Sequence, residues 1–220
     1  MANDTSSLPF SIPADLLPFT EPLPVFRSKE HPFISLPFTH YIASSLVFEP
    51  NEGRLLIVQR SATDYGAHMW ELPGGTVDPH ESVLEGRRGT PRGVWTAVDV
   101  GEMRRRTARP APLRRFRDCL RPRAGQAFGG GRPEENTLWC RIAFMVEVED
   151  YARVTLDPEE HQAYLWVTET EVRTMRTQAG RELEFASEPM RATMLEGFRV
   201  GKAKKRVAAK RRAGAALQAR

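Results

Sequence analysis

Cysteine is scarce in this chain of 220 residues, which holds only Cys119 and Cys140. Two cysteines cannot build the disulfide framework of a small secreted domain, and no Cys/His spacing suits a zinc site. Long apolar runs are also missing: the longest, from 42 to 48, is interrupted by two serines and falls far short of the roughly 18 residues that a membrane span needs. The N-terminal residues do not have the pattern of a secretory leader. We therefore expect no membrane partner and a cytoplasmic location, with the nucleus as an alternative.

Charge is distributed unevenly along the chain. Residues 87–132 hold 13 arginines, no lysine and only 3 acidic residues, and residues 199–220 hold 9 basic residues and no acidic one. The rest of the chain has 10 basic and 25 acidic residues, although the whole carries a formal net charge of +4. The sequence thus predicts an acidic core, an arginine-rich insert without order and a basic tail.

Apolar and alternating patterns predict four strands and two helices within one domain. The first helix opens with a capping box formed by Thr168 and Glu171, and the second begins near Ser187. A proline-rich arm, residues 1–36, precedes the domain at 37–198, and a short helix is expected near Pro13 to Leu17. The strands are expected at 41–48, 54–59, 138–149 and 164–167, with a turn at 51–53. This order favours a mixed α/β fold.

The most informative segment is 70–75, which reads Trp-Glu-Leu-Pro-Gly-Gly and is followed by Glu81. It resembles the opening of the Nudix box, in which a glycine is followed after five residues by a glutamate, as Gly75 is by Glu81. The strand at 54–59 before it, and the Glu-Glu-His at 159–161 after it, fit the same resemblance. The likeness covers about residues 35–86 and 137–198 and is nearest to the Nudix-like proteins of filamentous fungi.

The resemblance implies an α/β/α sandwich around a mixed sheet. It also implies hydrolysis of a nucleoside diphosphate linked to another group, with Mg²⁺ or Mn²⁺ as cofactor. A pyrophosphate is anionic and repels hydroxide, so divalent ions must neutralise it and activate the water. Magnesium prefers oxygen ligands, which requires several carboxylates on one rigid element. The resemblance further implies that Gly74 and Gly75 bring the backbone close to the phosphates and that Arg60 contacts them, although a solvated strand end is the commoner role for such an arginine.

Three glutamates are the candidate catalytic residues. Glu81 and Glu85 lie four residues apart and would share one helical face, so together they could hold a metal ion. Glu160 lies in the loop where related enzymes place a further carboxylate. Each also has a purely structural alternative, since Glu81 and Glu85 could be solvated carboxylates and Glu160 part of a surface turn. For His161 a structural role is favoured over a catalytic one.

The second half of the box departs from the pattern. The pattern demands Arg-Glu-apolar-any-Glu-Glu-any-Gly-apolar at 89–97, where the chain reads Gly-Thr-Pro-Arg-Gly-Val-Trp-Thr-Ala. The metal-binding glutamates of the family are absent. In a helix interior a glycine costs about 1 kcal/mol and a proline about 3 kcal/mol, so the supporting helix is not expected either. The resemblance therefore predicts an impaired or inactive hydrolase.

A shifted reading frame could explain the break. When the codons of residues 88–97 are read one nucleotide further on, they are compatible with Ala-Glu-Leu-Arg-Glu-Glu-Cys-Gly-Leu, which supplies most of the missing block. Our hypothesis is that residues 87–132, within a wider anomalous segment 87–136, derive from out-of-frame or intronic sequence. Genomic or transcript sequence across codons 84–140 tests it.

Two alternative functions remain at this point. The chain could be a catalytically silent Nudix-like module that binds a nucleotide or a protein. It could also bind nucleic acid through its basic insert and tail, although the tail is equally well explained as the solvated end of the last helix. Binding to nucleic acid would weaken steeply with salt and persist in EDTA.

Overall fold

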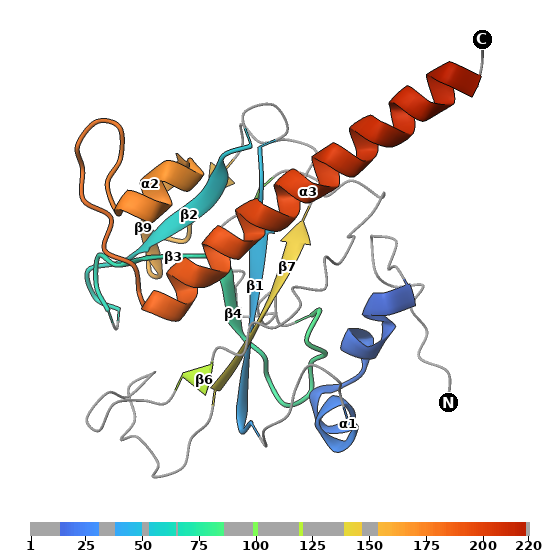
Figure 1. Ribbon diagram of the computed structural model, residues 1–220. Coiled ribbons are helices and arrows are strands. Elements are labelled where there is room, and N and C mark those ends of the chain that lie inside the picture. The colour runs from blue at the N-terminus through green and yellow to red at the C-terminus, as the bar shows by residue number, and fades with distance from the viewer. Residues whose placement is uncertain are drawn as a thin grey trace.

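The computed structural model describes residues 14–30, 38–49, 53–64, 66–85, 99–100, 119–120, 139–146 and 154–218. Two short helices come first, two more follow the last strand, and the strands lie between them (Figure 1). The helices are the 3-10 helix η2 (Ala14–Thr20), α1 (Leu23–Ser28), α2 (Glu169–Thr174) and α3 (Glu188–Gln218). The prediction of a mixed α/β fold is confirmed. No helix in these ranges is both long and apolar enough to cross a membrane.

The strands form a mixed sheet and two smaller antiparallel sheets. In the mixed sheet β1 (His40–Val47) runs parallel to β7 (Trp139–Val146) over eight residue pairs and antiparallel to β4 (Gly74–Thr76). Its order is β4, β1, β7, β6 (Cys119–Leu120). The second sheet has the order β3 (Trp70–Glu71), β2 (Leu55–Arg60), β9 (His161–Val167), and the third pairs β5 (Asp99–Val100) with β8 (Val154–Thr155). The expected mixed sheet is present, but β2 and β9 lie in a separate sheet.

Helices cover both faces of β1. Successive residues of a strand point to opposite sides, so the side chains of β1 enter two different cores. Tyr41 faces a core formed with η2 and α1, where its ring lies edge-on to Phe26 at 5.8 Å between centroids. Leu46 faces a second core formed with β2, β9, α2 and α3. All residues of β1 from Ala43 to Val47 are buried, as expected for a central strand covered on both sides. Helices therefore lie on both faces of this strand.

Helix α3 packs closely on the sheet through a glycine. Met190, Met194 and Phe198 recur at four-residue spacing on its buried side. A Cβ atom on Gly197 would lie 2.9 Å from Leu46 Cδ2, so a larger residue here would force the Leu46 side chain to move. The helix then continues to Gln218 and projects beyond the rest of the fold (Figure 1).

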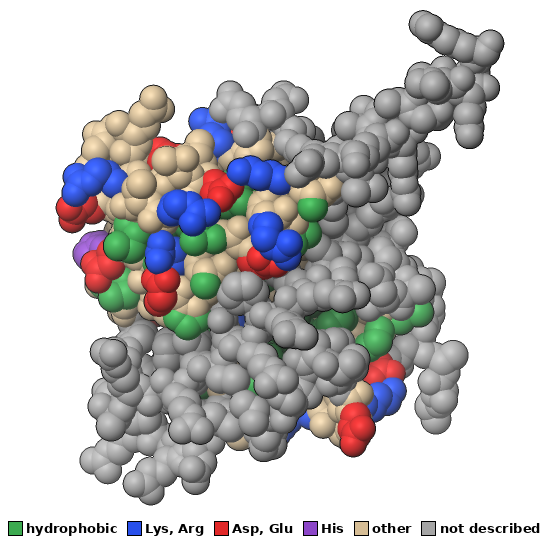
Figure 2. Space-filling view, in the orientation of Figure 1, with side chains coloured by type: hydrophobic (Ala, Val, Ile, Leu, Met, Phe, Trp, Pro, Cys, Tyr) green, Lys and Arg blue, Asp and Glu red, His purple; other side chains and the backbone are tan. Residues whose placement is uncertain are grey.

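The surface over α2 and the first turns of α3 mixes both signs of charge (Figure 2). Ion pairs join Arg173 and Lys202 to Glu169, and Arg191 to Glu188. These pairs are exposed, so each contributes less than about 1 kcal/mol to stability.

Local signals predicted most of the elements well. The capping box at Thr168 is present, with the hydroxyl accepting from the Glu171 N–H and the Glu171 carboxylate accepting from the Thr168 N–H. The expected helix near Pro13 to Leu17 is found as η2. The second arm helix, α1, departs from the extended arm that the prolines predict. Pro24 lies in the first turn of α1, where a missing N–H does no harm.

The prediction for the last strand was too short. β9 begins at His161, three residues before the expected start, because His161 pairs with Arg60 across a register irregularity at the end of β2. The arginine-rich insert, by contrast, lies outside the described residues, except for the two strand-paired dipeptides 99–100 and 119–120.

Candidate functional site

The two glycines of the motif hold β4 against β1. Gly74 lies opposite Ser44, and Gly75 lies opposite Ala43. A Cβ atom on Gly74 would lie 2.2 Å from the Ala43 carbonyl oxygen, which no side chain could accommodate without moving the strand. The first contribution of Gly74 is therefore close packing of two strands, which fixes where the following turn begins.

That turn, from Asp78 to Glu85, carries two of the predicted carboxylates. Glu81 is almost fully buried, and its Oε2 accepts a hydrogen bond from the Asp78 N–H at 3.2 Å. The Glu85 Oε2 accepts from the Ser82 N–H at 2.9 Å, and the Ser82 hydroxyl accepts from the Glu85 N–H at 3.1 Å. The latter pair forms a capping box, which is the normal start of a helix. Each glutamate thus uses one oxygen to shape its own backbone.

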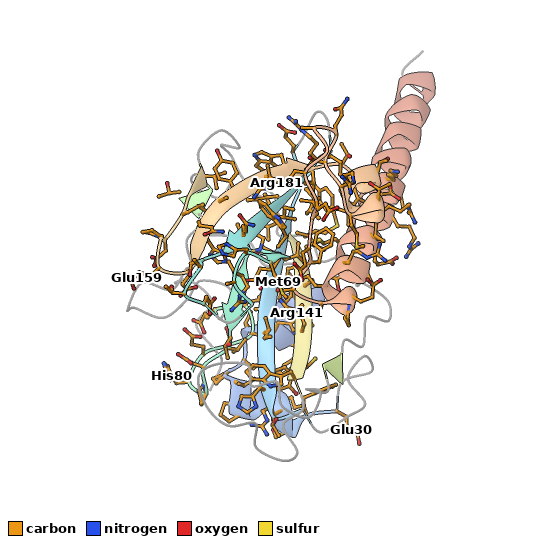
Figure 3. The ribbon with its side chains drawn as sticks, turned by 90° about the vertical axis from the view of Figure 1, so that its left-hand side faces the viewer. Glu30, Met69, His80, Arg141, Glu159 and Arg181 are labelled. Carbon is orange, nitrogen blue, oxygen red and sulfur yellow. The ribbon has the colours of Figure 1, made fainter. Side chains whose placement is uncertain are left out.

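The N-terminal arm is joined to this turn by backbone contacts. The Leu23 N–H donates to the Glu81 carbonyl at 2.8 Å, and the Leu84 N–H donates to the Phe19 carbonyl at 3.0 Å. A β-bridge joins Pro22 to Ser82 between them. The arm and the turn therefore form one wall of the molecule. His80 marks this turn near the lower edge of Figure 3, beside the blue helices of the arm.

A second group of charged residues assembles around Glu71 on β3. The Arg60 Nη1 donates to both Glu71 carboxylate oxygens at 3.0 Å, and the Arg60 Nη2 lies 2.6 Å from Asp64 Oδ2. Most of the guanidinium predicted to contact phosphate is thus occupied by two carboxylates. Its Nε is buried without a hydrogen-bond partner.

His161 completes the group from β9. Its Nε2 lies 3.3 Å from Glu71 Oε1, while its Nδ1 is buried and has no hydrogen-bond partner. Burial alone would raise the pKa of the Glu71 carboxyl, but the His161 hydrogen bond and the positive charges of Arg60 and Arg141 outweigh it, so the pKa lies below its usual value. Glu71 is therefore ionised at neutral pH. We use the name Glu71 cluster for Arg60, Asp64, Glu71, Glu160 and His161.

Glu160 is the one predicted catalytic residue that joins Arg60 in this cluster. Its carbonyl accepts from the Ser61 N–H at 2.7 Å, which ties its loop to the end of β2. Burial raises the pKa of its carboxyl; His161 opposes this, whereas the negative charges of Asp157, Asp64 and Glu71 add to it. Such opposed pKa shifts among neighbouring carboxylates are typical of functional sites.

Asp64, Glu71 and Arg141 belong to this cluster or its surroundings, but the sequence predicted no functional role for them. For His161 it favoured a structural role. Arg141, on β7, donates from Nη1 to the Ser44 hydroxyl at 2.7 Å and lies centrally in Figure 3, well apart from His80. The sequence signal for Glu71 was a glutamate within the motif at 70–75. In the structure this glutamate pairs across the sheet with the buried Val58. A charged residue at a position that faces a buried apolar one is seldom there for packing.

The described residues do not provide a complete divalent-metal site. In these parts of the chain no group of three or more His, Cys, Asp or Glu side chains is arranged to hold a metal ion. Glu81 and Glu85 lie in the same turn, but the carboxylate of each already accepts a hydrogen bond from a backbone N–H. Magnesium normally needs more oxygen ligands than this pair offers.

A comparison with known families supports the assignment of the motif. The model of the NUDIX domain matches residues 39–88, which include β1, β2, the glycines and the turn that follows them. No curated protein matches the chain.

Several solved structures are similar over most of the chain. The MutT protein of Methanosarcina mazei Go1 has 24% identity and a TM-score of 0.46, covering 76% of this chain and 99% of its own. An Ap4A hydrolase of C. elegans has 16% identity and a TM-score of 0.45, with coverage of 76% and 99%. The dihydroneopterin triphosphate pyrophosphohydrolase of E. coli has 15% identity and a TM-score of 0.45, with coverage of 73% and 95%.

Proposed function

We propose that the chain is a Nudix-type hydrolase of a nucleoside diphosphate linked to another group, impaired in its present form. The observation that carries this proposal is the geometry of residues 74–85 within the matched segment. Gly74 docks β4 on β1, and the chain then turns into a capping box that places Glu81 and Glu85 one turn apart. This is the start of the element on which the family carries its metal ligands.

The impairment follows from the ligands that are missing. When bound, a divalent ion would neutralise the diphosphate and lower the pKa of a water molecule. The described residues offer no group of three ligands for it, so we assign no step to the ion. What the chain retains is the backbone turn, Arg60 as a cation near the motif, and Glu160 as a carboxylate with a raised pKa.

A catalytically silent binding module is the second candidate. The absence of a three-ligand group in the described residues favours it, as does the pairing of Arg60 with Glu71 and Asp64. Such a module would bind a nucleotide without cleaving it. In both cases the basic tail could add binding to nucleic acid or direct the protein to the nucleus, and binding of this kind would weaken steeply with salt.

A restored chain separates the two candidates. Residues 89–97 would be replaced by Arg-Glu-Leu-Arg-Glu-Glu-Cys-Gly-Leu, and both chains would be incubated with Mg²⁺ and a panel that includes ADP-ribose and a dinucleoside polyphosphate. We expect the restored chain to hydrolyse at least one compound, and the present chain to reach at most about a hundredth of that rate. The matched control carries the same block with glutamine in place of each glutamate and should be as slow as the present chain.

Two outcomes would contradict the proposal. Equal rates for the present and restored chains would mean that the metal ligands lie elsewhere. Binding of a panel compound without turnover in either chain would favour the silent module.

A further inference from the structure

A cavity of about 670 Å³ lies between α1 and the turn that follows β4. Its lining residues come from α1, from the start of β1 and from residues 76–79, all of them described. Small-molecule sites usually have about 300–1,000 Å³, so the cavity has room for a ligand of moderate size. Four of its ten lining residues come from the arm, outside the segment that matches the NUDIX domain.

The walls of this cavity are held firmly in place. Leu23 and Val77 line the cavity, are buried and belong to the same core. The Leu23 N–H donates to the Glu81 carbonyl, and the Val77 N–H donates to the Tyr41 carbonyl at 2.9 Å. Because both walls are bonded to the same turn and strand, the cavity is preformed and a ligand would not have to order it.

The cavity carries one charge of each sign. Arg27 lies on the α1 side and Asp78 on the side of the turn. Within the described ranges no carboxylate forms an ion pair with Arg27, whereas its neighbour Lys29 is paired with Glu21. The Asp78 N–H interacts with Glu81, but no ion pair in the same ranges involves the Asp78 carboxylate. A guanidinium and a carboxylate in the cavity lining are thus available to a ligand.

Part of the cavity lining is apolar. Leu23, Pro24, Val77 and Pro79 line the cavity together with hydroxyl-bearing residues, among them Ser28. An arginine binds a phosphate through paired N–H groups, and an aspartate accepts hydrogen bonds from vicinal hydroxyls. Apolar walls suit the carbon skeleton that links the two.

We infer that this cavity binds a small sugar phosphate, free or as part of a nucleoside monophosphate, with Arg27 on the phosphate and Asp78 on the hydroxyls. This site needs neither a metal ion nor hydrolysis. It stands whether or not the chain cleaves diphosphates.

Equilibrium binding in EDTA tests the inference with ribose 5-phosphate, AMP, adenosine and inorganic phosphate as probes. Calorimetry should detect ribose 5-phosphate or AMP, with inorganic phosphate at least tenfold weaker. Arg27→Met should weaken binding of either sugar phosphate at least tenfold. Asp78→Asn should weaken binding of the sugar phosphates about fivefold or more but leave binding of inorganic phosphate unchanged.

Lys29→Met is the matched control, since it removes one positive charge from the same segment outside the cavity lining. It should alter binding less than twofold. Ser28→Trp, at another exposed lining position, would fill the cavity without changing its charge and should abolish binding while thermal unfolding stays unchanged.

Several results would overturn the inference. They are the absence of binding by the unaltered chain, equal losses in Arg27→Met and Lys29→Met, and equal affinity for ribose 5-phosphate and inorganic phosphate. Full binding by a folded Ser28→Trp chain would do the same. A ribose 5-phosphate affinity matching that of AMP would mean that the sugar phosphate alone is recognised, and a tighter AMP complex that the base is included.

Discussion

The turn from Asp78 to Glu85 and the Glu71 cluster both carry carboxylates near the glycine motif, but they hold them in different ways. In the turn, Glu81 and Glu85 accept hydrogen bonds from backbone N–H groups within three residues. In the cluster, Glu71 is held by Arg60 and His161 from two other strands. Local bonds shape the backbone, whereas long-range ones fix charged side chains relative to one another.

The carboxylates of the turn therefore have a structural role, whereas those of the Glu71 cluster are placed so that their charge and protonation can matter. A turn glutamate can be replaced at the cost of one hydrogen bond. A buried glutamate held by side chains of other strands leaves those side chains with fewer partners when it is replaced. The opposed pKa shifts of Glu71 and Glu160 are found in the cluster, so the cluster is where changes in protonation are expected to matter.

Replacement of Glu71 should have the largest effect. Glu71→Gln removes the charge that accepts two hydrogen bonds from Arg60 and leaves Asp64 as its partner, so we expect the free energy of unfolding at pH 7 to fall by about 2 kcal/mol. Urea denaturation measures it. The control Glu182→Gln breaks an exposed pair with Arg176 and should cost less than about 0.5 kcal/mol. Similar losses in the two variants would mean that the cluster is no more than a surface network.

The same pair of chains should respond to acid. Because the pKa of Glu71 is lowered in the folded state, its stabilising contribution is present above the unfolded-state value of about 4.3 and disappears as the pH falls through the lower folded value. The stability difference between the unaltered chain and Glu71→Gln should therefore shrink with acidification below about pH 4. A constant difference across this range would show that Glu71 does not act through its charge.

The two capping boxes should show an intermediate effect. Thr168→Ala removes the cap of the complete helix α2 and should cost about 1 kcal/mol. Ser82→Ala should cost less, about 0.5 kcal/mol, because in the described residues its box is followed only by a turn. Thermal unfolding of both variants measures this, and a larger loss at Ser82 would indicate that a helix does continue from it.

Glu160 should show the smallest effect, with the opposite sign. Because its pKa is raised in the folded state, its stabilising contribution is fully present below about pH 4.3 and is lost as the pH rises through the folded value. Glu160→Gln cannot ionise, so it should match the unaltered chain at low pH and exceed its stability at pH 7 by less than about 1 kcal/mol. Denaturation at several pH values tests this, and a loss of stability at pH 7 would place a favourable charge contact at Glu160.

The parts of this picture that depend on neighbouring residues could be predicted from the sequence. The cap at Thr168, the strand around Ala43 and the spacing from Gly75 to Glu81 are all local patterns, and the structure contains each of them. The Glu71 cluster could not be predicted. Glu71 and His161 are 90 residues apart, and the pairing of β9 with β2 that brings His161 into place has an irregular register at Arg60.

The length of α3 has a consequence for how the molecule behaves in solution. Its 31 residues span about 46 Å at 1.5 Å per residue, and the part after Gly201 accounts for roughly 25 Å of this. A rod of that length attached to a small body increases friction far more than mass. The chain should therefore both sediment and tumble more slowly than a compact particle of the same mass, and one ending at Lys202 should lose most of this excess drag.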